Sequence, residues 1–165
     1  FSELAQWAKT ANVDPTVATL LGLALIAGPM GKCAQFPLHL WLDEAMEGPM
    51  PASILRNTVV VATGAWVLVK LQPVIALSPV AMSAAVFIGG VTAVGGLLIA
   101  IAQIDIKRTL SYPVSAYMGL VFVAIGTGQT EGALLLVLTN AIAMALLVMA
   151  VGALVWMNVT QNVTQ

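Results

Sequence analysis

The stretch LQPVIALSPVAMSAAVFIGGVTAVGGLLIAIAQI, residues 71–104, contains no charged side chain, and it determines the class of structure that the chain adopts. A helix needs about 20 apolar residues to cross the roughly 30 Å hydrocarbon core of a bilayer, and this stretch exceeds that length. The composition agrees, because 60% of the residues are hydrophobic, 8% are charged and the mean hydropathy is +1.00. The sequence therefore predicts a membrane protein.

The apolar runs lack the alternation of apolar and polar residues that marks the strands of a membrane β-barrel, and an unpaired backbone is costly in lipid. We therefore expect an all-α fold, a polytopic bundle of about five transmembrane helices. The expected spans are 16–31 resuming at 37–46, then 52–71, 79–103, 109–125 and 131–156.

We expect a single membrane domain over residues 1–165, read as a piece of a longer protein. Residues 1–15 are amphipathic and are predicted to lie at the membrane interface, residues 16–157 form the transmembrane helices, and residues 158–165 form a polar tail. The net charge of −1 gives no basic patch, which excludes nucleic acid as a partner and leaves lipids and other membrane proteins. One cysteine and one histidine provide neither a disulfide nor a cysteine-based metal cluster.

The stretch GPMGKCAQFPLHLW, residues 28–41, places two prolines, two glycines and a lysine inside the first span. Pro29 lacks an N–H group and its ring clashes with the carbonyl of residue 25, so the helix is predicted to unwind near Lys32. Broken helices in membranes occur where protein or water satisfies the freed backbone groups, as at ion and proton sites. Burial disfavours the ammonium of Lys32 and the helix-end carbonyls favour it, so it can gain and lose a proton. The alternative is a lysine that snorkels to the interface, against which its depth argues.

Three further polar residues follow in and after this break. His39 lies seven residues beyond Lys32, two turns if the helix resumes, and either relays protons toward the acidic residues 43–47 or is an ordinary interfacial residue. The carboxylates of 43–47 are interpreted as a solvated face. Arg56 and Asn57 lie within two turns of the start of the second span, where Arg56 either snorkels or acts as a fixed charge that tunes Lys32.

Polar residues also mark the starts and middles of the last two spans. Asp105 suits a helix N-terminus, but Lys107 and Arg108 oppose the helix dipole there, which implies a partner carboxylate or a cavity; the loop can also be plain interface. Tyr112 precedes a proline early in the fourth span. Asn140 lies within the fifth span, where it either serves proton transfer or hydrogen-bonds a neighbouring helix.

Two motifs together resemble a known family. GKCAQFPLHLWLDEAMEGPMPAS, residues 31–53, and AQIDIKRTLSYPVSAYMGLVF, residues 102–122, resemble the antiporter-like subunit 5 (NdhF/NuoL type) of respiratory and photosynthetic complex I. The resemblance covers residues 20–154 and implies a central fragment that joins two inverted repeats. It also implies that Lys32 is the proton-carrying lysine of a discontinuous helix, and that Lys107 belongs to a proton relay along the midline of the membrane.

The chain departs from the family pattern at its histidines. Asn57, preceded by Arg56, stands where typical members have a histidine, and Leu136, Asn140 and Met144 stand where they have two histidines and a lysine. The stretch LRNTVVVATGAWVLVKLQPVIALSPVA, residues 55–81, resembles the form of the subunit found in cyanobacterial complexes for CO2 uptake. In that form, the resemblance implies, the subunit supports a peripheral CO2-hydrating subunit.

The resemblance implies a proton-translocating subunit of a redox-driven NAD(P)H or ferredoxin:plastoquinone oxidoreductase in a cyanobacterial thylakoid membrane. The chain is expected to hold no cofactor itself, because quinone, iron–sulfur clusters and electron donor are bound by other subunits. Two alternatives remain. The first is a docking scaffold that no longer pumps, and the second is a subunit of a monovalent cation/proton antiporter, which shares the lysine motif.

Overall fold

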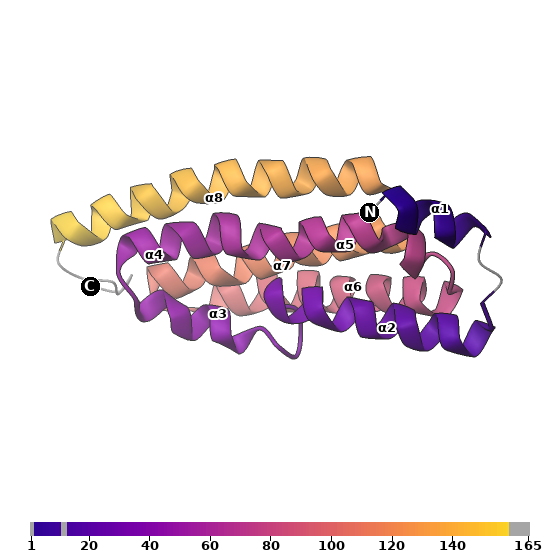
Figure 1. Cartoon of the computed structure of the whole chain (residues 1–165). Helices are drawn as coiled ribbons and strands as arrows, with labels where there is room; N and C mark the ends of the chain where they lie inside the picture. Colours follow the sequence, from indigo (N-terminus) through magenta and orange to yellow (C-terminus); the bar gives the residue numbers. More distant parts are fainter. Residues whose placement is uncertain (1, 11–12, 159–165) are drawn as a thin grey trace.

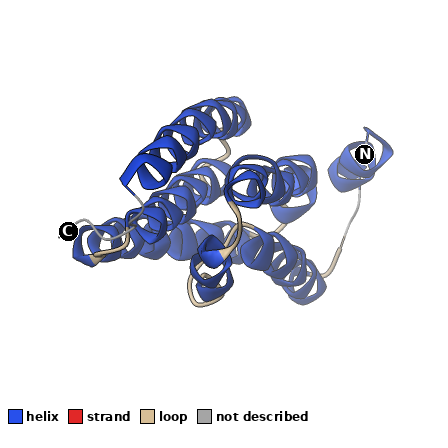
Figure 2. Cartoon of the chain, turned by 90° about the vertical axis from the view of Figure 1, so that its left-hand side faces the viewer, coloured by secondary structure: helices blue, strands red, loops and turns tan. Residues whose placement is uncertain are grey.

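The computed structural model describes residues 2–10 and 13–158, and these residues form helices and connecting loops without a strand (Figure 2). The all-α prediction is therefore confirmed. Two of the elements are single irregular turns: η1 is a 3-10 turn and η2 a π-helical turn. In chain order the elements are α1 Ser2–Thr10, α2 Pro15–Lys32, α3 Leu40–Glu44, η1 Ala45–Glu47, α4 Met50–Leu55, η2 Arg56–Val60, α5 Val61–Ile75, α6 Pro79–Ala102, α7 Ile106–Gly126 and α8 Thr130–Asn158.

The long helices lie side by side in one bundle (Figure 1). α6 and α7 form the most extensive helix pair, α7 also packs against α8, and α2 packs against α5. α4, η2 and α5 follow one another without a loop, and α8 contacts all three of them. The short helix α3 lies beyond the end of α2 and contacts α7, so α7 touches both the uninterrupted and the interrupted parts of the bundle.

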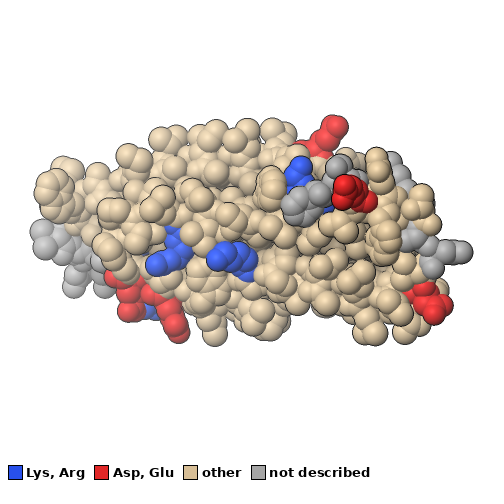
Figure 3. Space-filling model, in the orientation of Figure 1, with Lys and Arg blue, Asp and Glu red and all other residues tan. Residues whose placement is uncertain are grey.

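Four described helices are long and apolar enough to cross a membrane: Met50–Ile75, Pro79–Ala102, Ile106–Gly126 and Thr130–Met157. The remaining expected span consists of α2 and α3, separated by a loop that follows Lys32. Most of the face in Figure 3 carries neither acidic nor basic side chains, as a lipid-facing or helix-facing surface requires. The discontinuity of the first span is thus present where the sequence predicted it.

The structure corrects the cause and extent of that discontinuity. α2 continues through Pro29 to Lys32, and the Cys33 N–H donates to the Pro29 carbonyl at 2.8 Å. The effects of a proline fall on its own nitrogen and on the carbonyl four residues before it, so the turn after it can still close. The break follows Lys32, and helix resumes at Leu40 instead of residue 37.

Other predicted boundaries differ by smaller amounts. The second span begins at Met50 and continues past residue 71 to Ile75, again through an internal proline, and the third and fifth spans lie within two residues of their predicted ends. α1 falls inside the predicted interfacial segment 1–15 and contacts α5. Its location at a membrane surface stays a prediction, and residues 159–165 of the predicted polar tail lie outside the described residues.

The close approach of α6 and α7 depends on glycine. A methyl group added at Gly119 of α7 would lie 2.6 Å from the Gly89 carbonyl oxygen of α6, and one added at Gly96 would lie 3.1 Å from the Tyr112 carbonyl oxygen. Small residues let membrane helices approach closely, and Gly89 and Gly96 do so here, whereas a methyl group at Gly90 or Gly95 would meet nothing within 4 Å. This contact fixes α7 at the centre of the bundle, where its polar side chains meet the interrupted span.

Candidate functional site

The end of α2 is built as a Schellman motif. The Gln35 N–H donates to the Met30 carbonyl at 2.9 Å and the Ala34 N–H donates to the Gly31 carbonyl at 3.2 Å. These are the two hydrogen bonds that define this type of helix end. Its left-handed position is usually glycine, but here it is Ala34, with φ of 51°. Lys32 is therefore the last helical residue before a strained cap.

Lys32 lies in a groove between α2 and α5. The groove has a volume of about 290 Å³ and is lined by Gly28, Pro29, Lys32, Thr63, Gly64 and Val67. A methyl group on Gly64 would lie 2.9 Å from Lys32 Cβ and 2.8 Å from Cys33 Sγ, so α5 can accept the end of α2 only at a glycine. The Lys32 side chain itself is exposed, and among the described residues no carboxylate lies within ion-pair distance of it.

The loop after α2 and the start of α3 fold back onto the break. The Trp41 Nε1–H donates to the Gly31 carbonyl at 2.9 Å, which ties the two halves of the interrupted span together. His39 is half-buried, and its ring stacks on Phe36 with centroids 5.8 Å apart and lies 6.4 Å from the ring of Tyr112. The sequence placed His39 two turns beyond Lys32 on condition that the helix resumed. Residues 33–39 are not helical, so this placement of His39 is wrong. Its relay role stays a prediction.

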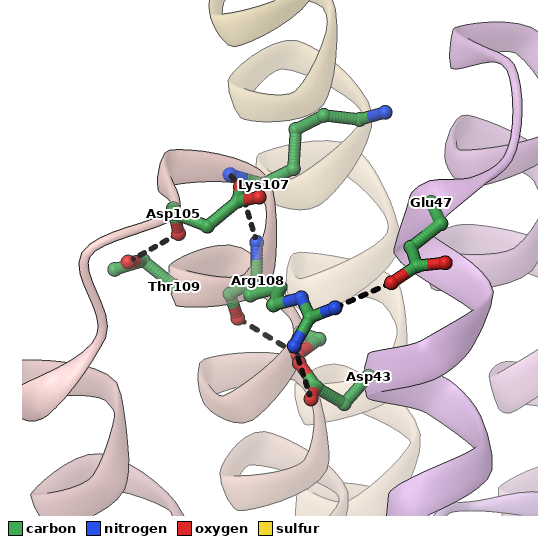
Figure 4. A network of polar contacts seen from close by, with 7 residues as sticks. Asp43, Glu47, Asp105, Lys107, Arg108 and Thr109 are labelled. Carbon is green, nitrogen blue, oxygen red and sulfur yellow. Dashed lines mark hydrogen bonds and ion pairs between the residues drawn. The ribbon is translucent and has the colours of Figure 1, made fainter. Parts of the chain in front are cut away.

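Arg108 joins the first turn of α7 to the acidic residues that follow the break (Figure 4). Its guanidinium donates to Glu47 Oε1 at 2.5 Å and lies 3.8 Å from Asp43 Oδ2. The Ser111 hydroxyl donates to Asp43 Oδ1 at 3.4 Å, and the Tyr112 hydroxyl interacts with the same carboxylate. The prediction that this basic pair needs a partner carboxylate is confirmed for Arg108. Asp43 is only 14% exposed, so the interpretation of residues 43–47 as one solvated face is wrong for Asp43.

Asp105 caps α7, as predicted for a residue at a helix N-terminus. Its Oδ1 accepts the N–H groups of Lys107 at 2.8 Å and Arg108 at 3.3 Å. Lys107 is 5% exposed, points away from the Arg108 network in Figure 4, and donates from Nζ to the Gly48 carbonyl at 3.1 Å. The two basic neighbours therefore have separate partners, and the buried Lys107 amine has a backbone oxygen where Arg108 has carboxylates.

The π-helical turn η2 carries Arg56 and Asn57. The Arg56 guanidinium donates to the Ala45 carbonyl of η1, and among the described residues no hydrogen bond or ion pair joins it to Lys32. Asn57 is fully buried, with a weak contact of 3.8 Å from Nδ2 to Met46 Sδ and no partner for Oδ1. Single π-helical turns inside helices are frequent at functional sites. The suggested tuning of Lys32 by Arg56 stays a prediction.

Asn140 lies buried in α8 with neither amide atom bonded to any described protein group. Gly152 of α8 contacts Met50 of α4, and the two helices run in opposite directions (Figure 1). α8 also contacts η2, the turn that carries Asn57, so the helix of Asn140 packs against that turn. Buried amides without protein partners are typical sites of bound water. The two asparagines thus lie on elements that contact each other, α8 and η2, and among the described residues no hydrogen bond joins either of them to the Arg108 network.

Sequence reasoning missed two residues that fasten the break, Gln35 and Ser115. Both are buried, and they exchange hydrogen bonds between the loop and α7: Gln35 Nε2 donates to the Ser115 carbonyl at 3.1 Å, and the Ser115 hydroxyl donates to the Ala34 carbonyl. A signal was available, since Ser115 lies four residues after Ser111 and thus on one face of α7 with the predicted polar residues. No comparable signal marks Gln35, because a glutamine two residues before a proline is ordinary in a loop.

The described residues contain no cluster of three or more histidine, cysteine, aspartate or glutamate side chains that could hold a metal ion. The polar groups at the site are an amine, a guanidinium, carboxylates, a phenol, an imidazole and amides. Such groups can accept, hold and release protons, or organise water that does so. The arrangement has three parts: the Lys32 groove, the Arg108 network and the buried asparagines.

The whole chain, residues 1–165, matches the family model described as NADH:quinone oxidoreductase/Mrp antiporter, transmembrane. The chain is 55% identical over its full length to NAD(P)H-quinone oxidoreductase subunit 5, organellar chromatophore 2, of Paulinella chromatophora, and covers 27% of that protein. It is 41% identical over 83% of its length to the chloroplastic subunit 5 of Phaseolus vulgaris, covering 18% of it. The chloroplastic subunit 5 of Chaetosphaeridium globosum is 37% identical over 88% of the chain, which covers 22% of that relative. The chain thus spans about a quarter, or less, of the length of these relatives.

Proposed function

This integral membrane chain belongs to the NADH:quinone oxidoreductase/Mrp antiporter transmembrane family, and on that premise we propose that it is the central part of a proton-translocating subunit 5 of an NAD(P)H-quinone oxidoreductase. The observation that carries the proposal is the interruption of the first span. Its first helix, α2, ends at Lys32, beside the groove between α2 and α5. An interrupted helix in lipid is tolerated only where protein or water satisfies the free backbone groups.

Lys32 is proposed to take up and release one proton at Nζ in each transport event. The last carbonyls of α2 carry the negative end of the helix dipole and stabilise the ammonium form. The groove has one hydroxyl, that of Thr63, among otherwise apolar side chains. The Lys32 side chain is exposed beside this groove, and its amine is proposed to exchange its proton with water there.

The proton path is proposed to continue at the start of α7 through Asp105, Lys107, Arg108 and Tyr112. His39, whose ring lies beside that of Tyr112, is proposed to belong to the same path. Support comes from the continuous set of contacts that leads from Tyr112 through Asp43 and Arg108 to the exposed Glu47. Asn57, Asn140 and Arg56 are proposed to serve a second stretch of the path between η2 and α8, where unpaired amide atoms can bind water.

The finer proposal is that the subunit belongs to the form of the complex that supports CO2 uptake in a thylakoid membrane. It is supported by the resemblance of residues 55–81 to that form and by Asn57 and Asn140 at positions where typical members have histidine. The partners would then be other membrane subunits and a peripheral CO2-hydrating subunit. Quinone, iron–sulfur clusters and the electron donor would be bound elsewhere in the complex, in keeping with a chain that offers one cysteine and one histidine.

The test is Lys32→Met in the full-length subunit, with light- or donor-driven acidification and CO2 uptake measured in the same cells. Lys70→Met is the matched control, because Lys70 is an exposed lysine of α5 that contacts the face of Trp66 at 5.4 Å. We expect Lys32→Met to abolish acidification while the complex still assembles, and Lys70→Met to leave it unchanged. Persistence of both activities in Lys32→Met would favour a docking scaffold, and sodium-dependent transport would favour a cation/proton antiporter.

A further inference from the structure

Among the described residues, most hydroxyl groups on helices bond within their own helix, but that of Ser115 does not. Ser83 donates to the Pro79 carbonyl, Thr139 to Leu135 and Thr58 to Ile54, each four residues back. Such bonds satisfy the hydroxyl locally and connect nothing else. The Ser115 hydroxyl instead leaves α7 and donates to the Ala34 carbonyl in the loop after Lys32.

The loop returns a hydrogen bond to the same residue. Gln35 is fully buried, and its Nε2 donates both to the Ser115 carbonyl at 3.1 Å and to the Cys33 carbonyl at 3.0 Å. On the other side of the loop, the Phe36 N–H donates to Thr92 Oγ1 of α6 at 3.0 Å. The backbone of residues 33–36 is therefore held from both α6 and α7, the two helices that pack most closely in the bundle.

These bonds act at a place where the backbone is strained. Ala34 adopts a left-handed conformation, φ of 51°, which is unfavourable for any residue with a Cβ atom. If the bonds to Ser115 and Gln35 were lost, Ala34 could relax to an ordinary conformation, and the Schellman motif that ends α2 would open. Lys32 lies two residues before Ala34, so the direction of its side chain and its distance from the last carbonyls of α2 depend on this motif.

We infer that Ser115 and Gln35 are positioning residues, here called the Ser115 latch, which hold the strained end of α2 so that Lys32 stays in the α5 groove during proton transfer. The inference rests on the proposed function of Lys32. Neither residue touches the Lys32 amine, and both act through the backbone of residues 33–35.

The experiment uses the full-length, assembled complex, with Ser115→Ala and Gln35→Met as the test variants. Two variants are controls: Ser115→Thr keeps the hydroxyl, and Ser83→Ala removes a hydroxyl that bonds only within its own helix. Two properties are measured: amide hydrogen exchange of residues 30–36, and the rate of proton transfer as a function of pH. We expect exchange about threefold to tenfold faster in Ser115→Ala and Gln35→Met, the range that follows from loss of one such hydrogen bond. We also expect a lower rate with a displaced pH profile, and values close to the wild-type for Ser115→Thr and Ser83→Ala.

The outcomes separate the latch from the transport role of Lys32. Unchanged exchange in both Ser115→Ala and Gln35→Met overturns the latch. Faster exchange with an unchanged rate and pH profile shows a loop fastening that does not position Lys32, and this also overturns the inference. If Ser115→Ala fails to assemble, Gln35→Met alone decides by the same two measurements. Normal transport in Lys32→Met instead overturns the proposed function, and the exchange data remain interpretable.

Discussion

Arg108 of α7 and Asp43 of α3 lie 3.8 Å apart between guanidinium nitrogen and carboxylate oxygen, and so connect an uninterrupted helix to the segment that follows the break (Figure 4). Asp43 is 14% exposed and also interacts with Ser111 and Tyr112, whereas Glu47, the second partner of Arg108, is 72% exposed. Partly buried ion pairs with additional hydrogen bonds are screened less by salt than exposed pairs.

The first prediction compares the two carboxylates. Asp43→Asn should lower the thermal midpoint of the assembled complex clearly, because it leaves several donors without a charged acceptor. Glu47→Gln should have a small effect that disappears at high salt, as for most exposed ion pairs. Thermal melting of both variants at low and high ionic strength provides the measurement. A larger decrease of the thermal midpoint in Glu47→Gln would show that Asp43 is not the carboxylate that contributes most to the stability of the Arg108 network.

The second prediction concerns Ala34, whose left-handed backbone costs a residue with a side chain about 1–2 kcal/mol. Ala34→Gly should remove this strain. The greater entropy of glycine in the unfolded chain offsets part of the gain, so the net stabilisation should be up to about 1 kcal/mol. Ala34→Val should destabilise it, because a β-branched residue tolerates this conformation poorly. Thermal melting of the purified complex checks both directions. A destabilising glycine would contradict the Schellman assignment at the end of α2.

The third prediction concerns the glycine under Lys32. Gly64→Ala should displace the end of α2 and slow proton transfer, because the added methyl group would lie 2.8 Å from Cys33 Sγ. Adding Cys33→Ala removes that sulfur and should restore part of the rate. Gly90→Ala is the control, since a methyl group there meets nothing within 4 Å. Full activity of Gly64→Ala alone would mean that contact between α2 and α5 does not set the position of Lys32.

The fourth prediction concerns Asn140, whose amide atoms have no partner among the described protein groups. Asn140→Leu should leave the thermal midpoint unchanged or higher, because replacing an unpaired buried polar group by an apolar one of similar size is neutral or stabilising. Proton transfer should fall severalfold if the amide holds water in the path. Thr139→Val is the control, because Thr139 is exposed and bonds only within α8. Normal transport by Asn140→Leu would remove this residue from the proposed path.

Much of the fold follows from the sequence, because charge and hydropathy control which segments enter a membrane. The charge-free run of residues 71–104 and the capping residues Ser78 and Asp105 define α6 and the start of α7 to within a few residues. The break after Lys32 could be anticipated from its glycines and prolines. Its extent, up to Leu40, could not, because it depends on Ala34 being held in a left-handed conformation by groups from α7, a contact that links residues 81 positions apart.

The types of residue at the site could be predicted from the sequence, but most of their hydrogen-bond and ion-pair partners could not. A basic pair at the start of α7 requires a counter-charge by simple electrostatics, and Arg108 has one. Which of the acidic residues pair with Arg108, Asp43 and Glu47 but not Glu44, depends on which face of α3 and η1 meets α7, and only the fold decides that. Lys107 received a backbone carbonyl instead of a carboxylate for the same reason, since its side chain leaves α7 toward Gly48.

The central claim is that Lys32 exchanges protons and is more than a fixed positive charge. Lys32→Arg in the full-length subunit tests it most directly, because arginine keeps the charge and stays protonated at every accessible pH. The measurement is light- or donor-driven proton translocation by membranes that contain the assembled complex. We predict that Lys32→Arg loses translocation to the same extent as Lys32→Met while the complex still assembles. Translocation at the wild-type rate in Lys32→Arg would contradict the account, because only the charge of Lys32 would then be needed.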